Sequence, residues 1–522
     1  MIDPEAMSTM SAVSRSVAQR TPDKICNRFE GRDTTFKEFD RRVDQVANAL
    51  DASSAKVVAY LGKNCDHVFE IFVGVTRFGG KFAPLNWRLA PAEIIEILRQ
   101  YPPEILFFGP EFLQAAKEIS NALPDLPILA MESSDGPWTT YEEWRDAQPD
   151  AAFEDRSSSG DPAVVLFTSG TTGVPKAVLI SHANLLQPKL DSLPVKHIYD
   201  HWDNDDIGYV AMPLAHIGGI GFWVISFVNG CTSVIQREFD PVGALDAIHK
   251  ERVTKLFVVP AALQIVIQHS KAKDVDFSCI STVMYGAAPM PLPLLQEAIE
   301  VIGCKFIQCY GMTETTGTIA ILPPEDHKPE GSTRMRSAGR PAMGCEIAVF
   351  DPEGQPVKTG EIGEIAIRAP ANMIGYWNNP DATAKTLRDD GWLLSGDAGY
   401  LDEDGYLFIH DRIKDMIISG GENVYPAEVE STLYAHPSIR EAAVIGVPDP
   451  KWGEAVRAIV TLKPDTTIDE AEVLDWMRGK LAAFKCPKAI DVIDVMPRNA
   501  SGKLLKRDLR APFWEGRERQ VN

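Results

Sequence analysis

The chain has 522 residues, of which 45% are hydrophobic and 24% charged, and 52 Lys and Arg against 73 Asp and Glu give a formal net charge of −21. This is the composition of a globular protein with several cores, which excludes the disordered, collagen-like and coiled-coil classes. Because a strongly acidic chain repels nucleic acid and anionic membranes, we expect neither as a partner.

The eight cysteines and the apolar segments indicate the compartment. No two cysteines have C-x-x-C spacing, and Cys304 and Cys309 have no histidine nearby, so zinc is not expected. Isolated cysteines are typical of a reducing cytosol. The first residues have no apolar signal-peptide core, and the longest apolar run, 217–228, is shorter than the ~20 residues that span a bilayer. We therefore expect a cytoplasmic protein without an integral membrane segment.

In the first two thirds of the chain, strand-like apolar runs alternate with helix-like periods. Strands are predicted at 56–62, 104–109, 163–170, 255–260 and 305–311, and an amphipathic helix is predicted over Pro91–Leu98. This alternation is typical of an α/β fold in which helices cover parallel strands.

The pattern changes after about residue 345. Shorter strands at 346–351, 361–368 and 404–412, separated by turn residues, predict antiparallel hairpins or a small barrel. A compact α+β unit follows Arg412. Its predicted elements are a helix at Pro426–Tyr434, strands at Glu441–Val447 and Ala455–Leu462, and a helix near Asp469–Leu481 with a Thr467/Glu470 capping box.

The first motif with chemical content is a loop that follows an apolar strand. Its members are Thr168, Ser169, Gly170, Thr171, Thr172, Gly173 and Lys176. Glycines let backbone amides approach an anion, hydroxyls donate hydrogen bonds, and the lysine adds charge, so the loop predicts phosphate binding. Gly173 and Lys176 are not adjacent, which excludes a Walker A loop. The alternative is a polar surface turn.

The second motif, residues 308–316, also follows an apolar strand, at the sheet edge where α/β proteins bind ligands. Tyr310 can stack on a base, Thr313 can bond a phosphate, and Glu314 can hold Mg²⁺. The alternative is a solvated turn.

Two further motifs lie toward the C-terminus. Asp397, just past a glycine, can accept both hydroxyls of a ribose, with Arg412 beside it; the alternative is a structural Asp397–Arg412 pair. Lys503 follows Ser-Gly and can act as a reaching cation; the alternative is a solvated lysine.

In this order and spacing, the four motifs resemble the adenylate-forming (AMP-binding) superfamily, in its acyl-CoA synthetase (acid–CoA ligase) branch. Residues 84–91, 285–288 and 411–430 extend the resemblance, which covers about residues 14–511. It implies two parallel-rich α/β sheets plus a small distorted β-barrel in an N-terminal adenylation domain, residues 1–412. A small mobile α+β domain, residues 413–522, would follow.

In that family a carboxylate attacks the α-phosphorus of ATP to give acyl-AMP and pyrophosphate, and the thiolate of coenzyme A then takes the acyl group. The resemblance implies that the loop from Thr168 to Lys176 holds the β- and γ-phosphates, that Glu314 holds Mg²⁺, and that Asp397 and Arg412 hold the ribose. Lys503 would bridge the carboxylate and the α-phosphate. Gly286, Ala287, Ala288 and Tyr310 would hold the adenine, and the remaining nucleotide-binding positions are Gly311, Met312 and Thr313.

The resemblance also implies that the C-terminal domain rotates about Lys414 between the two half-reactions. One orientation would deliver Lys503. The other would deliver the loop 419–423 to the tunnel for the pantetheine arm of coenzyme A, where the expected contacts are Gly420, Gly421, Glu422 and Asn423.

Residues 212–223 resemble the entry to the family's acid pocket, with His216 as a gate near the acyl carbonyl. The expected lining is Ile217, Gly219, Ile220, Trp223, Gly286 and Gly311, with Phe222, Met284 and Ile319 nearby, and Trp223 could close the pocket. No Asp occurs between Ala211 and Asn229 to pair a substrate ammonium, which disfavours amino acids. A fatty, aryl or arylalkanoic acid is expected.

Two other functions stay open at this stage. One is an adenylating enzyme that passes acyl-AMP to a separate carrier protein or to oxygen. The other is a non-catalytic acyl or nucleotide sensor. The natural acid, the pathway and the choice between monomer and homodimer are not readable from the sequence.

Overall fold

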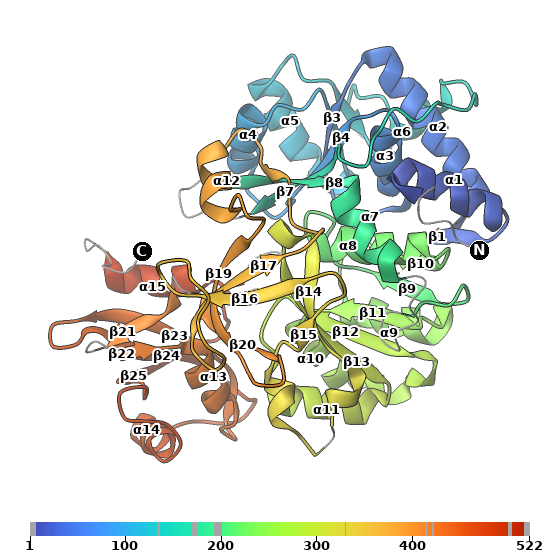
Figure 1. Cartoon of the computed structure of the whole chain (residues 1–522). Helices are drawn as coiled ribbons and strands as arrows, with labels where there is room; N and C mark the ends of the chain where they lie inside the picture. Colours follow the sequence, from blue (N-terminus) through green and yellow to red (C-terminus); the bar gives the residue numbers. More distant parts are fainter. Residues whose placement is uncertain are drawn as a thin grey trace.

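The computed structural model describes residues 7–132, 136–168, 175–192, 201–328, 330–412, 415–419, 422–498 and 504–515; for residues 192, 411, 412 and 423 it describes only the backbone. Two large sheets lie side by side, and a smaller C-terminal part packs at one end (Figure 1). Among the described residues no helix is long and apolar enough to cross a membrane.

The first large sheet has seven strands and is parallel except at one edge. Its order is β18 (Gly375–Tyr376), β8 (Lys176–Ser181), β7 (Pro162–Thr168), β4 (Lys81–Leu85), β3 (Val57–Leu61), β5 (Ile105–Phe108) and β6 (Ile128–Ala130). Strands β8 and β18 run antiparallel to their neighbours. The strands predicted at 56–62, 104–109 and 163–170 are therefore confirmed.

The second large sheet has nine strands. Its order is β15 (Arg340–Pro341), β14 (Gly317–Leu322), β13 (Lys305–Met312), β12 (Thr282–Gly286), β11 (Lys255–Val258), β9 (Ile207–Val210), β10 (Thr232–Ile235), β1 (Ile25–Phe29) and β2 (Arg32–Thr35). The strands from β13 to β1 pair in parallel, whereas β2, β14 and β15 are antiparallel. The predicted parallel-rich sheets are confirmed, with antiparallel strands at the sheet edges.

The helices form three layers around these sheets. The central layer is α1 (Met10–Arg20), α2 (Phe36–Ser53), α3 (Asp66–Arg77), α7 (His182–Ser192) and α8 (Ile217–Val228), with α6 (Tyr141–Asp146) beside it. Helices α4 (Pro91–Gln100) and α5 (Leu113–Ala122) cover the outer face of the first sheet. The second sheet is covered by α9 (Pro241–Glu251), α10 (Pro260–Gln268) and α11 (Leu292–Ile302). Both faces of each sheet are therefore buried.

The predicted antiparallel region is a four-stranded sheet of β16 (Glu346–Phe350), β17 (Gly363–Arg368), β19 (Leu393–Leu401) and β20 (Leu407–Arg412). It is curled and closes only half of a barrel. Helix α12 (Pro380–Thr386) precedes β19.

The C-terminal part is a small α+β domain. Its strands are β21 (Ile417–Ser419), β22 (Glu422–Val424), β23 (Ile439–Asp449), β24 (Gly453–Leu462) and β25 (Ala489–Val492), and its helices are α13 (Pro426–Tyr434), α14 (Glu470–Arg478) and α15 (Lys506–Trp514). The predicted capping box is wrong: Asp469, not Thr467, caps α14, and its carboxylate accepts from the amides of Ala471 and Glu472.

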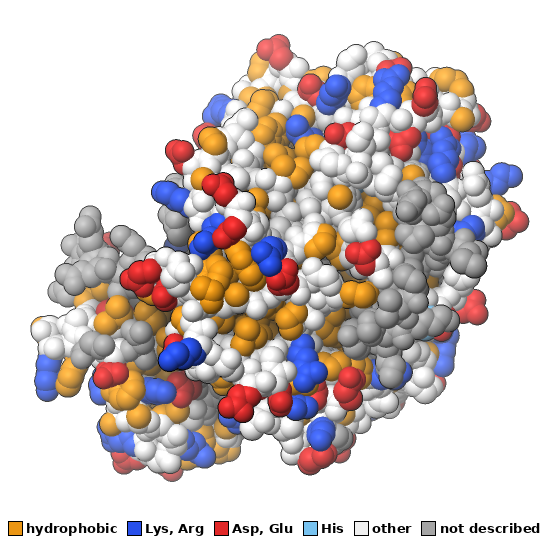
Figure 2. Space-filling view, in the orientation of Figure 1, with side chains coloured by type: hydrophobic (Ala, Val, Ile, Leu, Met, Phe, Trp, Pro, Cys, Tyr) orange, Lys and Arg blue, Asp and Glu red, His pale blue; other side chains and the backbone are white. Residues whose placement is uncertain are grey.

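The surface shows how the acidic charge is distributed. On the face drawn in Figure 2, acidic and basic side chains are interspersed, and apolar side chains are visible between them near the centre. The net charge of −21 therefore forms no large acidic patch on that face.

Candidate active site

The described ends of the predicted phosphate loop, Thr168 and Lys176, lie on the paired strands β7 and β8. Thr168, the last residue of β7, pairs with Lys176, the first residue of β8. The Thr168 hydroxyl donates to the Lys176 carbonyl at 3.5 Å. Ser169, Gly170, Thr171, Thr172 and Gly173 lie outside the described residues. The hairpin thus holds both described ends of the loop at the carboxyl end of β7.

The Lys176 ammonium lies over an aromatic ring that the sequence reading missed. Its Nζ is 4.6 Å from the centre of the Tyr376 ring, on the neighbouring strand β18. Such cation–π contacts hold a cation in place without neutralising it. The charge of Lys176 is therefore still present for a phosphate.

Glu314 sits in a 3₁₀ turn, Thr313–Thr315, directly after β13. Its side chain is buried, and the Tyr376 hydroxyl donates to Oε1 at 2.9 Å. The backbone amide of Met373 donates to the Glu314 carbonyl at 2.8 Å. Burial, and secondarily the charge of Glu314, raise the pKa of Tyr376, so its hydroxyl stays protonated as a donor.

The donor set at Glu314 fits magnesium bound together with a nucleotide. Among the described residues, no group of three or more His, Cys, Asp or Glu side chains could enclose a metal ion. The second carboxylate oxygen of Glu314, Oε2, has no hydrogen-bond partner in the described part of the chain. Mg²⁺ is commonly held by one or two carboxylates plus substrate phosphates, which is what this site offers.

The predicted adenine and ribose residues come together across two sheets. The Tyr310 hydroxyl on β13 donates to Asp397 Oδ2 on β19 at 2.6 Å. Asp397 is also paired across the ladder with the backbone of Arg412, whose side chain is not described. Residues 87 positions apart in sequence therefore meet at one hydrogen bond.

Two of the predicted glycines are required by close backbone packing. A Cβ on Gly286 would lie 2.1 Å from the Cys309 carbonyl oxygen, and one on Gly311 would lie 1.7 Å from the Gly317 carbonyl oxygen. Ala287 follows Gly286 with φ +64°, in the left-handed region. Ala288, Met312 and Thr313 lie beside these positions, at the ends of β12 and β13. The turns that would face the nucleotide are thus closely packed.

His216 stands at the N-terminal cap position of α8. Its buried Nε2 atom has no hydrogen-bond partner among the residues that the structure describes. Burial, with a smaller effect from the Arg88 charge, lowers the pKa of His216 to about 4, so the ring is neutral at physiological pH. An unsatisfied buried nitrogen is costly, and a substrate oxygen at this position would satisfy it.

The other residues predicted for the acid pocket divide into two groups. Ile217 is partly buried. Its side chain would lie 3.7 Å from a Cβ added to Gly317 and 4.0 Å from one added to Gly221, where it would be the nearest neighbour. Gly219 packs under the Pro213 carbonyl. Ile217 therefore lies beside Gly317, at the end of the turn that begins at Gly311.

Ile220 and Trp223 belong to the second group, on the core side of α8. Trp223 is fully buried; its ring stacks on Phe69 and Phe227 at 4.3 and 4.5 Å, and its Nε1 donates to Asn27. Ile220 is likewise buried in the central core. Trp223 therefore packs between helices, and the expectation that it closes the acid pocket is corrected.

Several residues predicted to act in the C-terminal domain lie outside the described residues: Lys414, Gly420, Gly421 and Lys503. Asn423 is described only by its backbone in β22, and the Glu422 side chain is exposed. In the described part of this domain, Ser419 of β21 pairs with Glu422 of β22.

A space of about 180 Å³ lies between the two domains. Ala288 and the start of α10 line it on one side, and Arg440, Lys463 and Arg498 line it on the other. Arg498 belongs to the motif that ends in Lys503. That motif therefore begins at the same space as Ala288, the last residue of the predicted adenine segment.

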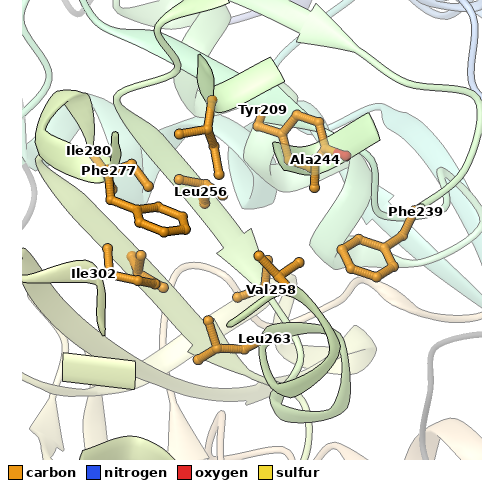
Figure 3. A pocket seen from close by; sticks show the side chains of 12 residues that line it. Tyr209, Phe239, Ala244, Leu256, Val258, Leu263, Phe277, Ile280 and Ile302 are labelled. Atoms are coloured by element: carbon orange, nitrogen blue, oxygen red, sulfur yellow. The ribbon is translucent and has the colours of Figure 1, made fainter. Parts of the chain in front are cut away.

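An apolar cavity behind the second sheet is a packing void. It encloses about 10 Å³ and is lined by residues of the sheet and its outer helices, including Tyr209, Phe239, Val258 and Leu263 (Figure 3). That volume is at the limit for one water molecule and far below that of an organic acid. The cavity is therefore not the acid site.

Comparison with known proteins defines the class of the molecule. The fold matches that of ATP-bound MatB from Rhodopseudomonas palustris with a TM-score of 0.87 at 30% identity, covering 97% of this chain and 99% of the other. The architecture is therefore that of an adenylate-forming enzyme.

The family follows from the sequence comparisons. Residues 14–377 match the AMP-binding enzyme family and residues 428–503 match the AMP-binding enzyme C-terminal domain. The chain belongs to the AMP-binding enzyme family, among its AMP-forming acid–thiol ligases. It is 39% identical over 506 residues to the fatty acid–[acyl-carrier-protein] ligase ScoC of Streptomyces coeruleorubidus, covering 96% of this chain and 95% of that protein. It is 36% identical over 501 residues to a feruloyl-CoA synthase of Amycolatopsis sp., covering 95% and 97%.

Proposed function

We propose that the protein is an ATP-dependent acid–CoA ligase. A carboxylate and ATP give acyl-AMP and pyrophosphate, and the acyl group then passes to coenzyme A with release of AMP. The observation that carries the proposal is the 2.6 Å hydrogen bond between Tyr310 and Asp397, which joins the residues proposed for the base and the ribose. The similarity to ATP-bound MatB supports the same nucleotide.

The residues proposed for the first half-reaction together counter the negative charge of the triphosphate. Lys176 and the loop from Thr168 meet the β- and γ-phosphates, and Glu314 holds Mg²⁺, which when bound neutralises phosphate charge. Lys503 bridges the attacking carboxylate and the α-phosphate. Neutralising the repulsion between two anions is the main electrostatic task of this step.

The acid enters beside His216. The neutral ring can hydrogen-bond a substrate oxygen through Nε2, and the nearby charge of Arg88 favours an anionic substrate. Ile217, Gly221 and Gly317 offer an apolar surface, and the sequence has no Asp between Ala211 and Asn229 to pair an ammonium group. This supports a fatty, aryl or arylalkanoic acid, in agreement with the fatty and feruloyl substrates named for the two relatives.

The second candidate differs only in the acceptor. The relative with 39% identity is named as a ligase to an acyl-carrier protein, which favours a separate carrier protein as the alternative thiol. In this proposal both acceptors present the same pantetheine arm, to a tunnel lined by Gly420, Gly421, Glu422 and Asn423, and Lys414 is the hinge between the domain orientations.

A panel of acids tests the proposal. Fatty acids of graded length, aryl acids and arylalkanoic acids are incubated with ATP and Mg²⁺, together with coenzyme A, a pantetheinylated carrier protein, or no acceptor. We expect acid-dependent pyrophosphate release and consumption of the coenzyme A thiol. Thiol consumption only with the carrier would establish the second candidate. Nucleotide binding without pyrophosphate release from any acid would contradict both.

A further inference from the structure

Residues 370–377 form a strap between the two large sheets. On one side the strap contacts the turn that follows β13, and on the other it pairs with β8, the strand that begins at Lys176. Toward the turn after β13, the Thr316 hydroxyl donates to the Ala371 carbonyl and the Met373 amide donates to the Glu314 carbonyl. Toward β8, Gly375 and Tyr376 pair with Leu179 and Val178, and the Trp377 amide donates to the Ala177 carbonyl. The Asn184 side-chain amide donates to the Pro370 and Asn372 carbonyls. The strap therefore fixes the turn after β13 relative to the start of β8.

Tyr376 contacts both proposed phosphate-site residues at once. Its hydroxyl donates to Glu314 Oε1 at 2.9 Å, and its ring lies 4.6 Å from the Lys176 ammonium. The residue is buried, and its own amide donates to the Thr383 hydroxyl at 2.9 Å. Neither backbone nor ring is therefore free to move away from the two charged groups.

We propose that Tyr376 is a positioning residue that sets the geometry of the metal carboxylate and the phosphate lysine. The inference rests on the proposed function. By engaging Oε1, the hydroxyl fixes the rotation of the Glu314 carboxylate and leaves Oε2 directed away from the tyrosine. The ring face attracts the ammonium and limits the rotamers of a long flexible side chain. One side chain thus orients two groups that must act on the same triphosphate.

The two contacts can be separated by two substitutions. Tyr376→Phe keeps the ring above Lys176 and removes the hydroxyl, with its bond to Glu314 and its hydrogen bond with Thr386. Tyr376→Leu removes both contacts. Tyr406→Phe is the matched control, because Tyr406 is also buried and its hydroxyl donates to another carboxylate, Asp326, at 2.6 Å.

The readouts are Mn²⁺ binding with a non-hydrolysable ATP analogue, followed by electron paramagnetic resonance, and the Mg²⁺ dependence of acid-dependent ATP–pyrophosphate exchange. For Tyr376→Phe we expect about tenfold weaker Mn²⁺ binding and a similar shift of the Mg²⁺ midpoint, because a hydrogen bond to a charged group is lost. The KM for ATP at saturating Mg²⁺ should stay within about twofold. Tyr376→Leu should raise that KM as well.

The control decides between positioning and packing. Tyr406→Phe should lower the melting temperature to a similar extent as Tyr376→Phe and leave the metal dependence unchanged. If Tyr376→Phe behaves like the control in both readouts, the positioning role is overturned. Mn²⁺–nucleotide binding without acid-dependent exchange in the wild type would reject the proposed reaction, and the Mn²⁺ affinities of the variants would still decide the role of Tyr376.

Discussion

The Asp397 carboxylate gives the sharpest test of the nucleotide site. It already accepts the Tyr310 hydroxyl at 2.6 Å, and in our account it also accepts both ribose hydroxyls. A hydrogen bond to a charged group contributes about 1.5–3 kcal/mol, so two such bonds correspond to roughly 3 kcal/mol or more. Asp397→Ala should therefore weaken ATP binding by about a hundredfold or more.

The assay compares two proteins, the wild type and Asp397→Ala, with two ligands, ATP and 2′,3′-dideoxy-ATP. Each affinity is measured by calorimetry. In the wild type, the dideoxy analogue should bind about a hundredfold more weakly than ATP. In Asp397→Ala, the two ligands should bind within about threefold of each other, since the partner of the hydroxyls is gone.

Asp397→Ala also leaves the Tyr310 hydroxyl without its carboxylate partner, so Tyr310→Phe is the control for that change. It keeps the ring and should retain most of the preference for ATP over the dideoxy analogue. Equal loss of affinity for both nucleotides in Asp397→Ala would show that the carboxylate has only its structural role beside Tyr310.

Four further predictions concern chemistry, hinge, pocket and pH. Lys503→Ala should reduce ATP–pyrophosphate exchange roughly a thousandfold and spare thioester formation from supplied acyl-AMP; equal loss in both assays would refute its role. Lys414→Pro should slow one half-reaction more than the other, and unchanged rates in both would remove it as the hinge. Gly221→Val should impair long or bulky acids more than short ones at constant KM for ATP, because only Ile217 adjoins that position; equal impairment of all acids would argue against a pocket there. Burial lowers the pKa of His182 from 6.5 to about 4, so the unfolded chain takes up a proton at a higher pH than the folded chain does. The free energy of unfolding should therefore fall as the pH drops from 6.5 toward 4, by roughly 2 kcal/mol at pH 5. Denaturant unfolding should show a smaller loss in His182→Asn, and an identical loss would contradict this assignment.

Much of the fold and several site positions were predictable because they depend on local sequence. Apolar runs such as 305–311 were long enough to identify β13, and helix α13 was predicted with the bounds that the structure has, Pro426–Tyr434. The family resemblance, and not local pattern alone, indicated Gly286 and Gly311, and in the structure close backbone packing excludes a side chain at both.

What was missed depends on contacts between distant segments. Tyr376 is 62 positions from Glu314 and lies outside the four motifs, and its Gly-Tyr dipeptide carries no chemical signal until β18 pairs with β8. Trp223 was expected at the acid pocket because residues 212–223 resemble the family's acid-pocket entry. Six residues along α8 turn the Trp223 side chain away from that of Ile217, to where it meets Phe69 and Phe227. Asp469 replaced Thr467 as the cap of α14 because boundaries of short helices are weakly specified by sequence.

The most direct test of the central claim is a crystal structure with Mg²⁺ and a non-hydrolysable ATP analogue. We predict the β- and γ-phosphates at the β7–β8 hairpin beside Lys176, the metal ion on Glu314 and the ribose on Asp397. A nucleotide bound away from these three residues would contradict the account.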